Sequence, residues 1–312
     1  MKKWSISAHN CFTRCQRQYF FRYIMAHHNA KDPLRREAYL VNQLSSLDAW
    51  KGKLVHSALE KYFIPSLQQN NLISCEELTQ NTLALAEQQL NFSRQKKYRE
   101  LGVTKTKAGN KYLALKIHEE DNTQSNSIKR IFDEIKQCYQ NLYNYDEFIS
   151  FLINKANWHE TEFRLSFKLN GVTIVGQPDL LVGYRDKPDD INSPNKICVI
   201  DWKTGKNQNS DYSTQLYLYG LEVVNSSRWS SYNLADLLLV EAYLFQNKFI
   251  KRLIDVSKKI EIENYIDRSI SNIKSVTGDH KYSLDKLKNY NYASNPISCQ
   301  YCNFESICKN LS

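Results

Sequence analysis

The stretch KICVIDWKTG, residues 196–205, carries the strongest structural signal in the chain. Its first half is almost continuously apolar, which is typical of a β-strand that is buried on both faces. Its second half places Asp201 and Lys203 two residues apart, where the period-two geometry of a strand puts both side chains on one face. Charges at the end of such a strand are costly unless they are paired or bound to a metal. The stretch therefore predicts a central strand that carries a charged pair into a site.

The flanking sequence predicts more strands around this one. Residues 159–169 alternate apolar and polar side chains, which indicates one strand. Asn170-Gly171 follows, the strongest short hairpin signal, and residues 172–184 read as the return strand with Asp179 near its middle. After a loop over 185–195 and the quoted strand, the pattern predicts a helix over 212–224, a strand over 236–246 and a helix over 256–274.

Helical patterns dominate the first half of the chain. They cover residues 11–26, residues 48–63 with Asp48 as the N-cap, and residues 74–150 with a polar interruption over 94–111. Strands in the middle, with helices before, between and after them, predict an α/β fold: a mixed central β-sheet flanked by helices. We expect a single domain over 1–312, with a helical insertion over 64–157 and the sheet core over 158–255.

Composition sets limits on partners and location. The 312 residues carry a formal net charge of +9, which favours polyanionic partners, either nucleic acid or an anionic membrane face. Lys2 and Lys3 are not followed by the apolar stretch of a secretory signal, and no window reaches the roughly 18 apolar residues of a membrane span. We therefore expect a soluble cytoplasmic protein without a membrane partner.

Asp179 and Asp201 form a candidate metal site. Two carboxylates on neighbouring strands can hold one hard divalent cation such as Mg²⁺ through oxygen. Such an ion lowers the pKa of bound water and stabilises charge on a phosphate, and Lys203 could neutralise developing negative charge. An isolated D-x-K is more often a pair of surface charges, but here it follows an apolar run, which favours a site.

Four short motifs in order carry a family resemblance. They are G-x-x-x-H-x-x-L-E at Gly52, His56, Leu59 and Glu60; G-x-x-D at Gly176 and Asp179; D-x-K at Asp201 and Lys203; and Q-x-x-x-Y at Gln215 and Tyr219. In this order and spacing the chain resembles the RecB-like branch of the PD-(D/E)XK nucleases. Each motif alone is common, whereas all four together are specific.

The resemblance implies a restriction-endonuclease-like core and a role for each matched residue. Mg²⁺ or Mn²⁺ would be held by His56, Asp179, Asp201 and the carbonyl of Trp202. Lys203 would be the catalytic lysine, and Gln215 and Tyr219 would support the site or touch the DNA backbone. The family's glutamate ahead of the second motif has a candidate in Glu162.

The cysteines predict a second centre. Cys299, Cys302 and Cys308 lie within ten residues at the end of the sequence, and Cys15 lies near its start. In a reducing cytosol such a set favours metal or cluster ligation over disulfides, and the C-x₂-C spacing suits zinc and iron–sulfur equally well. Cys11 lies one helical turn from Cys15 and could compete with it as a ligand.

The resemblance implies which group these cysteines hold. Some RecB-like nucleases, including the AddB subunit of helicase–nuclease complexes and the CRISPR spacer-acquisition nuclease, bind a 4Fe–4S cluster through one early and three late cysteines. Cys15 fits the family spacing better than Cys11, although Gln16 replaces the family's proline. The cluster would clamp residues 1–30 to residues 296–312.

Taken together, the sequence predicts a metal-dependent DNA nuclease that acts on single-stranded ends or flaps in repair, recombination or defence. The alternative is a non-catalytic nucleic-acid-binding protein that uses the same fold as a platform. No G-x-x-x-x-G-K-[ST] occurs, so a helicase or another ATPase subunit would have to supply any motor. Eight basic residues between Arg94 and Lys116 are candidates for contacts with a phosphate backbone.

Overall fold

The computed structural model describes residues 1–121, 125–161, 163–190, 192–206 and 212–311. Glu162 lies outside the described residues. The strands are β1 (Lys3–Trp4), β2 (Ala156–Thr161), β3 (Leu165–Leu169), β4 (Val172–Gly176), β5 (Leu180–Arg185), β6 (Asn195–Lys203), β7 (Leu237–Tyr243) and β8 (Lys248–Arg252).

The α-helices are α1 (Ile6–Arg14), α2 (Gln16–Tyr19), α3 (Pro33–Asn42), α4 (Leu47–Ala58), α5 (Ile64–Gln68), α6 (Cys75–Arg94), α7 (Lys105–Ala108), α8 (Lys116–Glu119), α9 (Ser125–Tyr143), α10 (Asp146–Ser150), α11 (Ser213–Val224), α12 (Val256–Thr277), α13 (Ile297–Gln300) and α14 (Glu305–Asn310). Three π-helical turns, η1 (Phe20–Met25), η2 (Leu59–Phe63) and η5 (Phe151–Lys155), extend α2, α4 and α10. Short 3₁₀ turns are η3 (Lys97–Arg99), η4 (Gly109–Lys111), η6 (Ser227–Trp229), η7 (Leu234–Asp236) and η8 (Leu284–Asn289).

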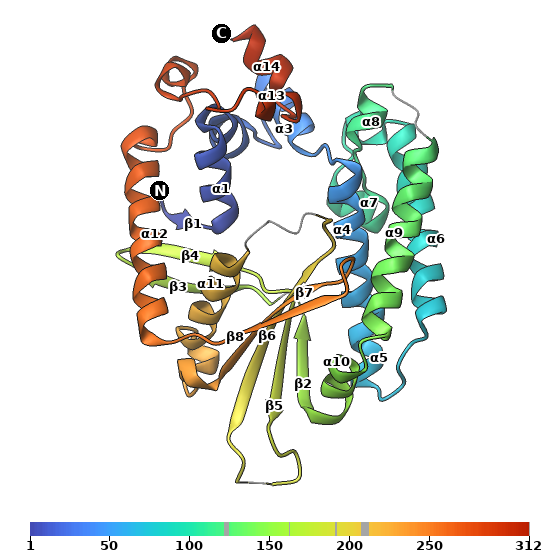
Figure 1. Cartoon of the computed structure of the whole chain (residues 1–312). Coiled ribbons are helices and arrows are strands. Elements are labelled where there is room, and N and C mark those ends of the chain that lie inside the picture. The colour runs from blue at the N-terminus through green and yellow to red at the C-terminus, as the bar shows by residue number, and fades with distance from the viewer. Residues whose placement is uncertain (122–124, 162, 191, 207–211, 312) are drawn as a thin grey trace.

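The strands form two sheets. A five-stranded sheet has the order β2-β5-β6-β7-β8, in which β6 and β7 are parallel and the other neighbours antiparallel. A three-stranded sheet has the order β1-β4-β3. Figure 1 shows helices on both sides of the larger sheet, α11 and α12 on one and α4, α6 and α9 on the other. The expected mixed sheet with flanking helices is confirmed, whereas the division into insertion and core stays a prediction.

Strand β6 separates two hydrophobic cores. Residues 197, 199 and 181 pack into the core that contains α11 and α12, while residues 198, 200 and 182 pack into the core that contains α4, α6 and α9. Residues 197–202 are buried, so the prediction of a strand covered on both faces is confirmed.

The predicted hairpin at Asn170-Gly171 is also confirmed. Both residues have positive φ, 46° and 77°, as a type I′ turn requires, and they join the antiparallel strands β3 and β4. The extent of the strands was predicted wrongly. Residues 159–169 belong to β2 and β3, which lie in different sheets, and residues 172–184 likewise divide into β4 and β5. In residues 161–169 the alternation of polar and apolar side chains continues from one sheet into the other, so this pattern does not reveal the change of sheet.

The predictions for the position of Asp179 and for the N-cap of α4 are wrong. Asp179 does not lie in the middle of a strand but immediately before β5, in the bend that connects the two sheets. The N-cap of α4 is Ser46, whose hydroxyl accepts from the backbone N–H of Ala49, and Asp48 lies in the first turn instead. A serine is as good a cap as an aspartate, and the sequence offers both.

Gly176 lets α11 approach β4 closely. A Cβ atom built at this position would lie 2.0 Å from Oε2 of the buried Glu222. We predict that Gly176→Ala lowers the free energy of unfolding by about 2 kcal/mol, the usual cost of overpacking a core, and lowers Tm by roughly 5 °C. Gly205→Ala is the matched control, because among the described residues, its chain neighbours apart, no atom lies within 4 Å of a Cβ there. Equal melting temperatures for the two variants would contradict this packing.

Candidate active site and cysteine cavity

The bend before β5 brings Asp179 opposite Asp201. Leu180 of β5 pairs with Ile200 of β6, so the next residues outward, 179 and 201, lie side by side at the end of the sheet. The Oδ2 atom of Asp179 accepts the backbone N–H of Trp202 at 2.7 Å, and its Oδ1 atom lies 3.0 Å from Nδ1 of His56. Asp179 is thereby held between β6 and α4.

Asp201 is a nearly buried carboxylate, with 3% of its surface exposed. It forms an ion pair with Lys203, the next residue on the same face of β6. Burial and the charge of Asp179 raise the pKa of the Asp201 carboxyl, and the positive charge of Lys203 partly opposes this rise. Two carboxylates that disfavour each other's charge in this way are stabilised by a cation placed between them.

Helix α11 supplies the partners of Lys203. The Nζ atom of Lys203 lies 3.4 Å from Oε1 of Gln215, and the amide of Gln215 donates to the Tyr219 hydroxyl at 2.6 Å. Gln215 and Tyr219 are four residues apart and so share one helix face. Lys203 also lies over the ring of Tyr212, 4.2 Å from its centroid. The ammonium group is therefore fixed beside the Asp201 carboxylate.

Helix α4 closes the other side of the site. At Gly52, a Cβ atom would lie 3.2 Å from the Thr204 hydroxyl, so the glycine permits the helix to approach the end of β6. His56 lies one turn further along the same face. In Figure 1 the end of β6 lies between α4 and α11. The structure thus brings together His56, Asp179, Asp201, Lys203, Gln215 and Tyr219, all of which the sequence had singled out.

The carboxylates of this site engage protein groups. In the described ranges, no three His, Cys, Asp or Glu side chains are gathered tightly enough to hold a metal ion. Asp179 instead bonds to His56 and Trp202, and Asp201 pairs with Lys203. The chemistry of the set still suits a divalent cation, because it offers adjacent carboxylate oxygens and an imidazole nitrogen.

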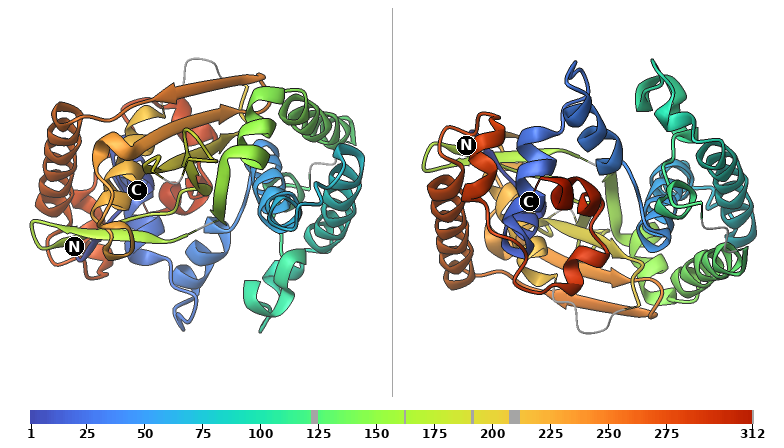
Figure 2. Two further views of the ribbon diagram at one scale, coloured as in Figure 1. Left: turned by 90° about the horizontal axis from the view of Figure 1, so that it is seen from below. Right: turned by 90° about the horizontal axis from the view of Figure 1, so that it is seen from above.

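Four cysteines line one cavity where the two ends of the sequence meet. Cys15, Cys299, Cys302 and Cys308 surround a space of about 210 Å³, together with Arg17 and Phe21. Figure 2 shows α13 and α14 packed beside the N-terminal helices in both views. The backbone N–H of Gln18 points at the sulfur of Cys15, at 3.4 Å, and the Arg17 guanidinium lies 3.5 Å from that of Cys308.

Cys11 lies behind the wall of this cavity, near Cys15 and Cys302. It is fully buried in the aromatic core, it is not among the residues that line the cavity, and burial raises the pKa of its thiol to about 11. Cys75, Cys138 and Cys198 belong to or pack against the core around α4 and α6. Of the two N-terminal candidates, the structure places Cys15 beside the three C-terminal cysteines.

Three residues of the candidate active site and the cysteine cavity were not identified from the sequence. The ring of Tyr212 lies under Lys203, but nothing in the sequence distinguishes this tyrosine from the other tyrosines of the chain, twenty in all. Arg17 is two residues from Cys15 and could have been suspected from that spacing. Glu222 is buried behind the site, and within the described residues neither of its carboxyl oxygens has a hydrogen-bond partner. Burial raises the pKa of the Glu222 carboxyl well above its ordinary value.

Comparison with known proteins places the chain in a family. Residues 3–309 match the model of the PD-(D/E)XK nuclease superfamily, so this chain belongs to that superfamily. Membership indicates a nuclease, and members of the superfamily typically use a divalent metal and act on nucleic acid.

Two further comparisons with known proteins give no information about function. A solved structure described as "Crystal structure of SSO0001" is 14% identical over 73% of this chain and 98% of that chain, with a TM-score of 0.30, too low to carry an argument. No curated protein matches the chain. Within the described ranges, no helix has the length and apolar character that crossing a membrane requires.

Proposed function

We propose that this protein is a Mg²⁺- or Mn²⁺-dependent deoxyribonuclease of the RecB-like type, which hydrolyses phosphodiester bonds at single-stranded ends or flaps. The observation that carries the proposal is the pairing of Asp179 and Asp201 at the end of two adjacent strands, with Lys203 fixed beside them by Gln215. A protein that only binds nucleic acid has no use for a nearly buried carboxylate next to a second one, which argues against the non-catalytic alternative.

His56, Asp179, Asp201 and the carbonyl of Trp202 would hold the metal. When bound, the ion supplies Lewis-acid stabilisation of charge on the scissile phosphate. The Trp202 N–H orients Asp179, because it donates to the Oδ2 atom and leaves Oδ1 facing α4.

Lys203 is the catalytic lysine of the proposal. Its ammonium group lies where it can neutralise negative charge that develops on the phosphate, and the ring of Tyr212 and the amide of Gln215 limit its movement. Tyr219 fixes the amide of Gln215 in turn. Glu162 completes the proposed set, on the basis of the family resemblance alone.

Cleavage assays on end-labelled DNA test the proposal. Anaerobically purified protein is incubated with single-stranded, blunt double-stranded and flap DNA, each with Mg²⁺, with Mn²⁺ and with a chelator. We expect metal-dependent products from the single-stranded and flap substrates. Binding of all three without any cleavage would favour the non-catalytic alternative. A role in repair, recombination or defence, with a helicase or another ATPase as partner, is part of the same proposal.

We further propose that Cys15, Cys299, Cys302 and Cys308 hold a 4Fe–4S cluster. All four line one cavity, and Arg17 places a positive charge beside Cys308, which suits an anionic group of thiolates. The spacing of the cysteines suits zinc equally well, and the choice of an iron–sulfur cluster rests on the family resemblance.

The assignment of the N-terminal ligand predicts a difference between two serine variants. Wild-type protein should be brown, with the broad visible absorption of an iron–sulfur centre. Cys15→Ser should lose the colour, because Cys15 lines the cavity, whereas Cys11→Ser should keep it. Absorption spectra and iron analysis measure the result. Colourless wild-type protein with one equivalent of zinc would remove the cluster and leave the four-ligand clamp.

A further inference from the structure

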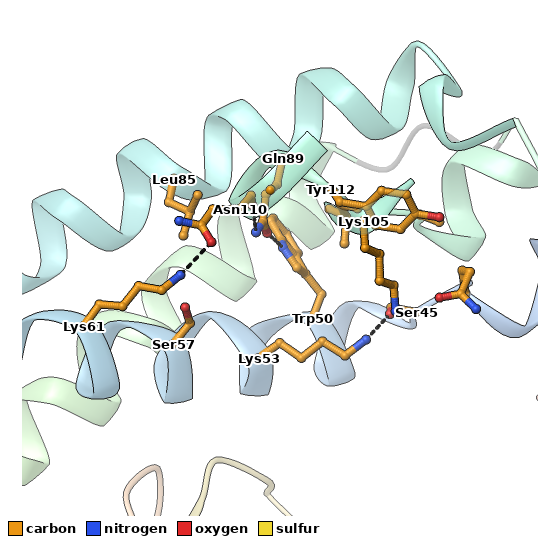
Figure 3. A pocket seen from close by; sticks show the side chains of 14 residues that line it. Ser45, Trp50, Lys53, Ser57, Lys61, Leu85, Gln89, Lys105, Asn110 and Tyr112 are labelled. Atoms are coloured by element: carbon orange, nitrogen blue, oxygen red, sulfur yellow. Dashed lines mark hydrogen bonds between the residues drawn. The ribbon is translucent and has the colours of Figure 1, made fainter. Parts of the chain in front are cut away.

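A second cavity, on another face of α4, is not explained by the metal site. It has a volume of about 280 Å³ and lies between α4 and the segment from α7 to Ala114, with α6 behind it. Figure 3 shows Lys53, Ser57 and Lys61 on the α4 side and Lys105, Asn110 and Tyr112 opposite them.

The charged side chains that line this cavity in the described residues are all positive. Among the described residues that line it, Lys53, Lys61 and Lys105 are cations and none is a carboxylate. Arg22 of η1 adds a fourth positive charge near Lys53 and Lys105. Burial lowers the pKa of the Lys53 amine, and the charge of Lys105 lowers it further. A group that carries negative charge would be stabilised where these cations meet.

The neutral groups of the cavity form a fixed frame. The indole N–H of Trp50 donates to Gln89 at 2.6 Å, and the amide of Gln89 donates to the backbone oxygen of Asn110 at 2.7 Å. Lys61 donates to the Asn110 side chain at 2.8 Å. Lys53 donates to the Ser45 hydroxyl at 2.6 Å, and Figure 3 shows the end of Lys105 reaching toward the same serine. The two ammonium groups therefore point to one place.

This arrangement distinguishes Lys105 from the basic residues near it in sequence. Arg99 pairs with Glu37 and Glu119, Lys96 pairs with Asp121, and Lys116 pairs with Glu120. Those three cations already have carboxylate partners. Lys105 instead lies 5.8 Å from the Tyr112 ring centroid and faces the cavity, as does Lys53.

The same helix connects the cavity to the proposed active site. Lys53, Ser57 and Lys61 are spaced four residues apart and form one stripe of α4 and η2. Gly52 and His56 lie on the neighbouring stripe, which faces Thr204 and Asp179. A strand held at the first stripe would thus run beside the residues of the second.

We propose that this cavity binds the phosphate backbone of single-stranded DNA, with Lys53 and Lys105 as the principal contacts, and holds the strand beside α4 for cleavage. The inference rests on the proposed function and adds a binding subsite to it. Tyr112 offers an aromatic ring at the same wall, which suits a nucleotide better than a free inorganic anion.

The test compares two double variants of equal charge. Lys53→Met/Lys105→Met removes the two contacts and keeps the apolar stems. Lys107→Met/Lys111→Met changes two exposed lysines of the same segment that do not line the cavity. Binding of a short dye-labelled single-stranded oligonucleotide is measured by fluorescence anisotropy over a range of salt concentrations, with a chelator present to prevent cleavage.

The cavity variant should bind roughly twentyfold more weakly than wild type at about 0.1 M salt. The slope of log K against log salt should be shallower by about 1.4, since each phosphate contact on a single strand contributes about 0.7. The control variant should keep the wild-type slope. Identical slopes for the two variants would overturn the subsite, while metal-dependent cleavage by the wild type would leave the nuclease proposal intact. Wild-type protein that neither binds nor cuts DNA would remove both.

Discussion

A Lys203→Met variant should bind single-stranded DNA like the wild type but cut it about 10²–10³-fold more slowly. The expected loss is that of one preorganised group that stabilises charge in the transition state. The lysine is fixed for this task by Tyr212 and Gln215 beside Asp201, as its contacts show. Single-turnover cleavage of end-labelled DNA measures the rate, and anisotropy measures the binding.

Lys206→Met is the control for that variant. Lys206 is three residues further along the chain and pairs with Glu134 at 2.6 Å, outside the proposed site. It should cut at the wild-type rate. Because Lys203→Met leaves Asp201 without its ion-pair partner, the melting temperatures of this variant and of the wild type are compared as well. A folded Lys203→Met protein that cuts at full rate would exclude this lysine from the chemistry.

A Cys302→Ser variant should melt roughly 10 °C below the wild type and lose solubility. The proposed clamp connects residue 15 to residue 299 and so closes a very long loop, whose closure is worth about 4–5 kcal/mol. At about 2–4 °C per kcal/mol for a chain of this kind, the loss is large and measurable by calorimetry or circular dichroism. The buried aromatic residues Phe21 and Phe304, which stack at 5.6 Å beside the cavity, would become exposed.

The Cys302→Ser variant also tests whether the proposed cluster only stabilises the fold or takes part in catalysis. Hydrolysis changes no oxidation state, so cleavage should fall only in proportion to the amount of folded protein. Cys138→Ser is a suitable control, because this cysteine is buried in the other core and does not line the cavity. A Cys302→Ser protein that melts like the wild type, binds DNA normally and yet cannot cut would place the cluster in catalysis.

Local motifs allowed the site residues to be predicted, but not the path of the chain between them. The D-x-K pair was found because it ends an apolar run, and the register of β5 and β6 then explains why Asp179 lies opposite it. The bend before β5 was not predicted, since residues 172–184 were read as one continuous strand although they divide between two sheets. That bend, and not a mid-strand position, is what turns Asp179 toward α4.

The cavity lined by Lys53 and Lys105 could not be predicted from the sequence, for a different reason. The sequence shows a run of basic residues between Arg94 and Lys116, but it does not show which of them pair with carboxylates. Only the fold shows that Arg99 is committed to two glutamates, whereas Lys105 meets Lys53 from a helix some fifty residues earlier. Partners that lie far apart in sequence decide which charges are available.

The Mn²⁺ dependence of the cleavage rate, compared between wild type and Asp201→Asn, tests the metal-dependent nuclease site most directly. The wild-type rate should rise with Mn²⁺ from a negligible value, fall when a chelator is added and return when Mn²⁺ is restored. The Asp201→Asn rate should stay at least about 10²-fold lower, because a neutral amide oxygen binds a divalent cation more weakly than a carboxylate and leaves its charge uncompensated. Wild-type cleavage that persists in the chelator, or an Asp201→Asn variant that cuts like the wild type, would contradict the account.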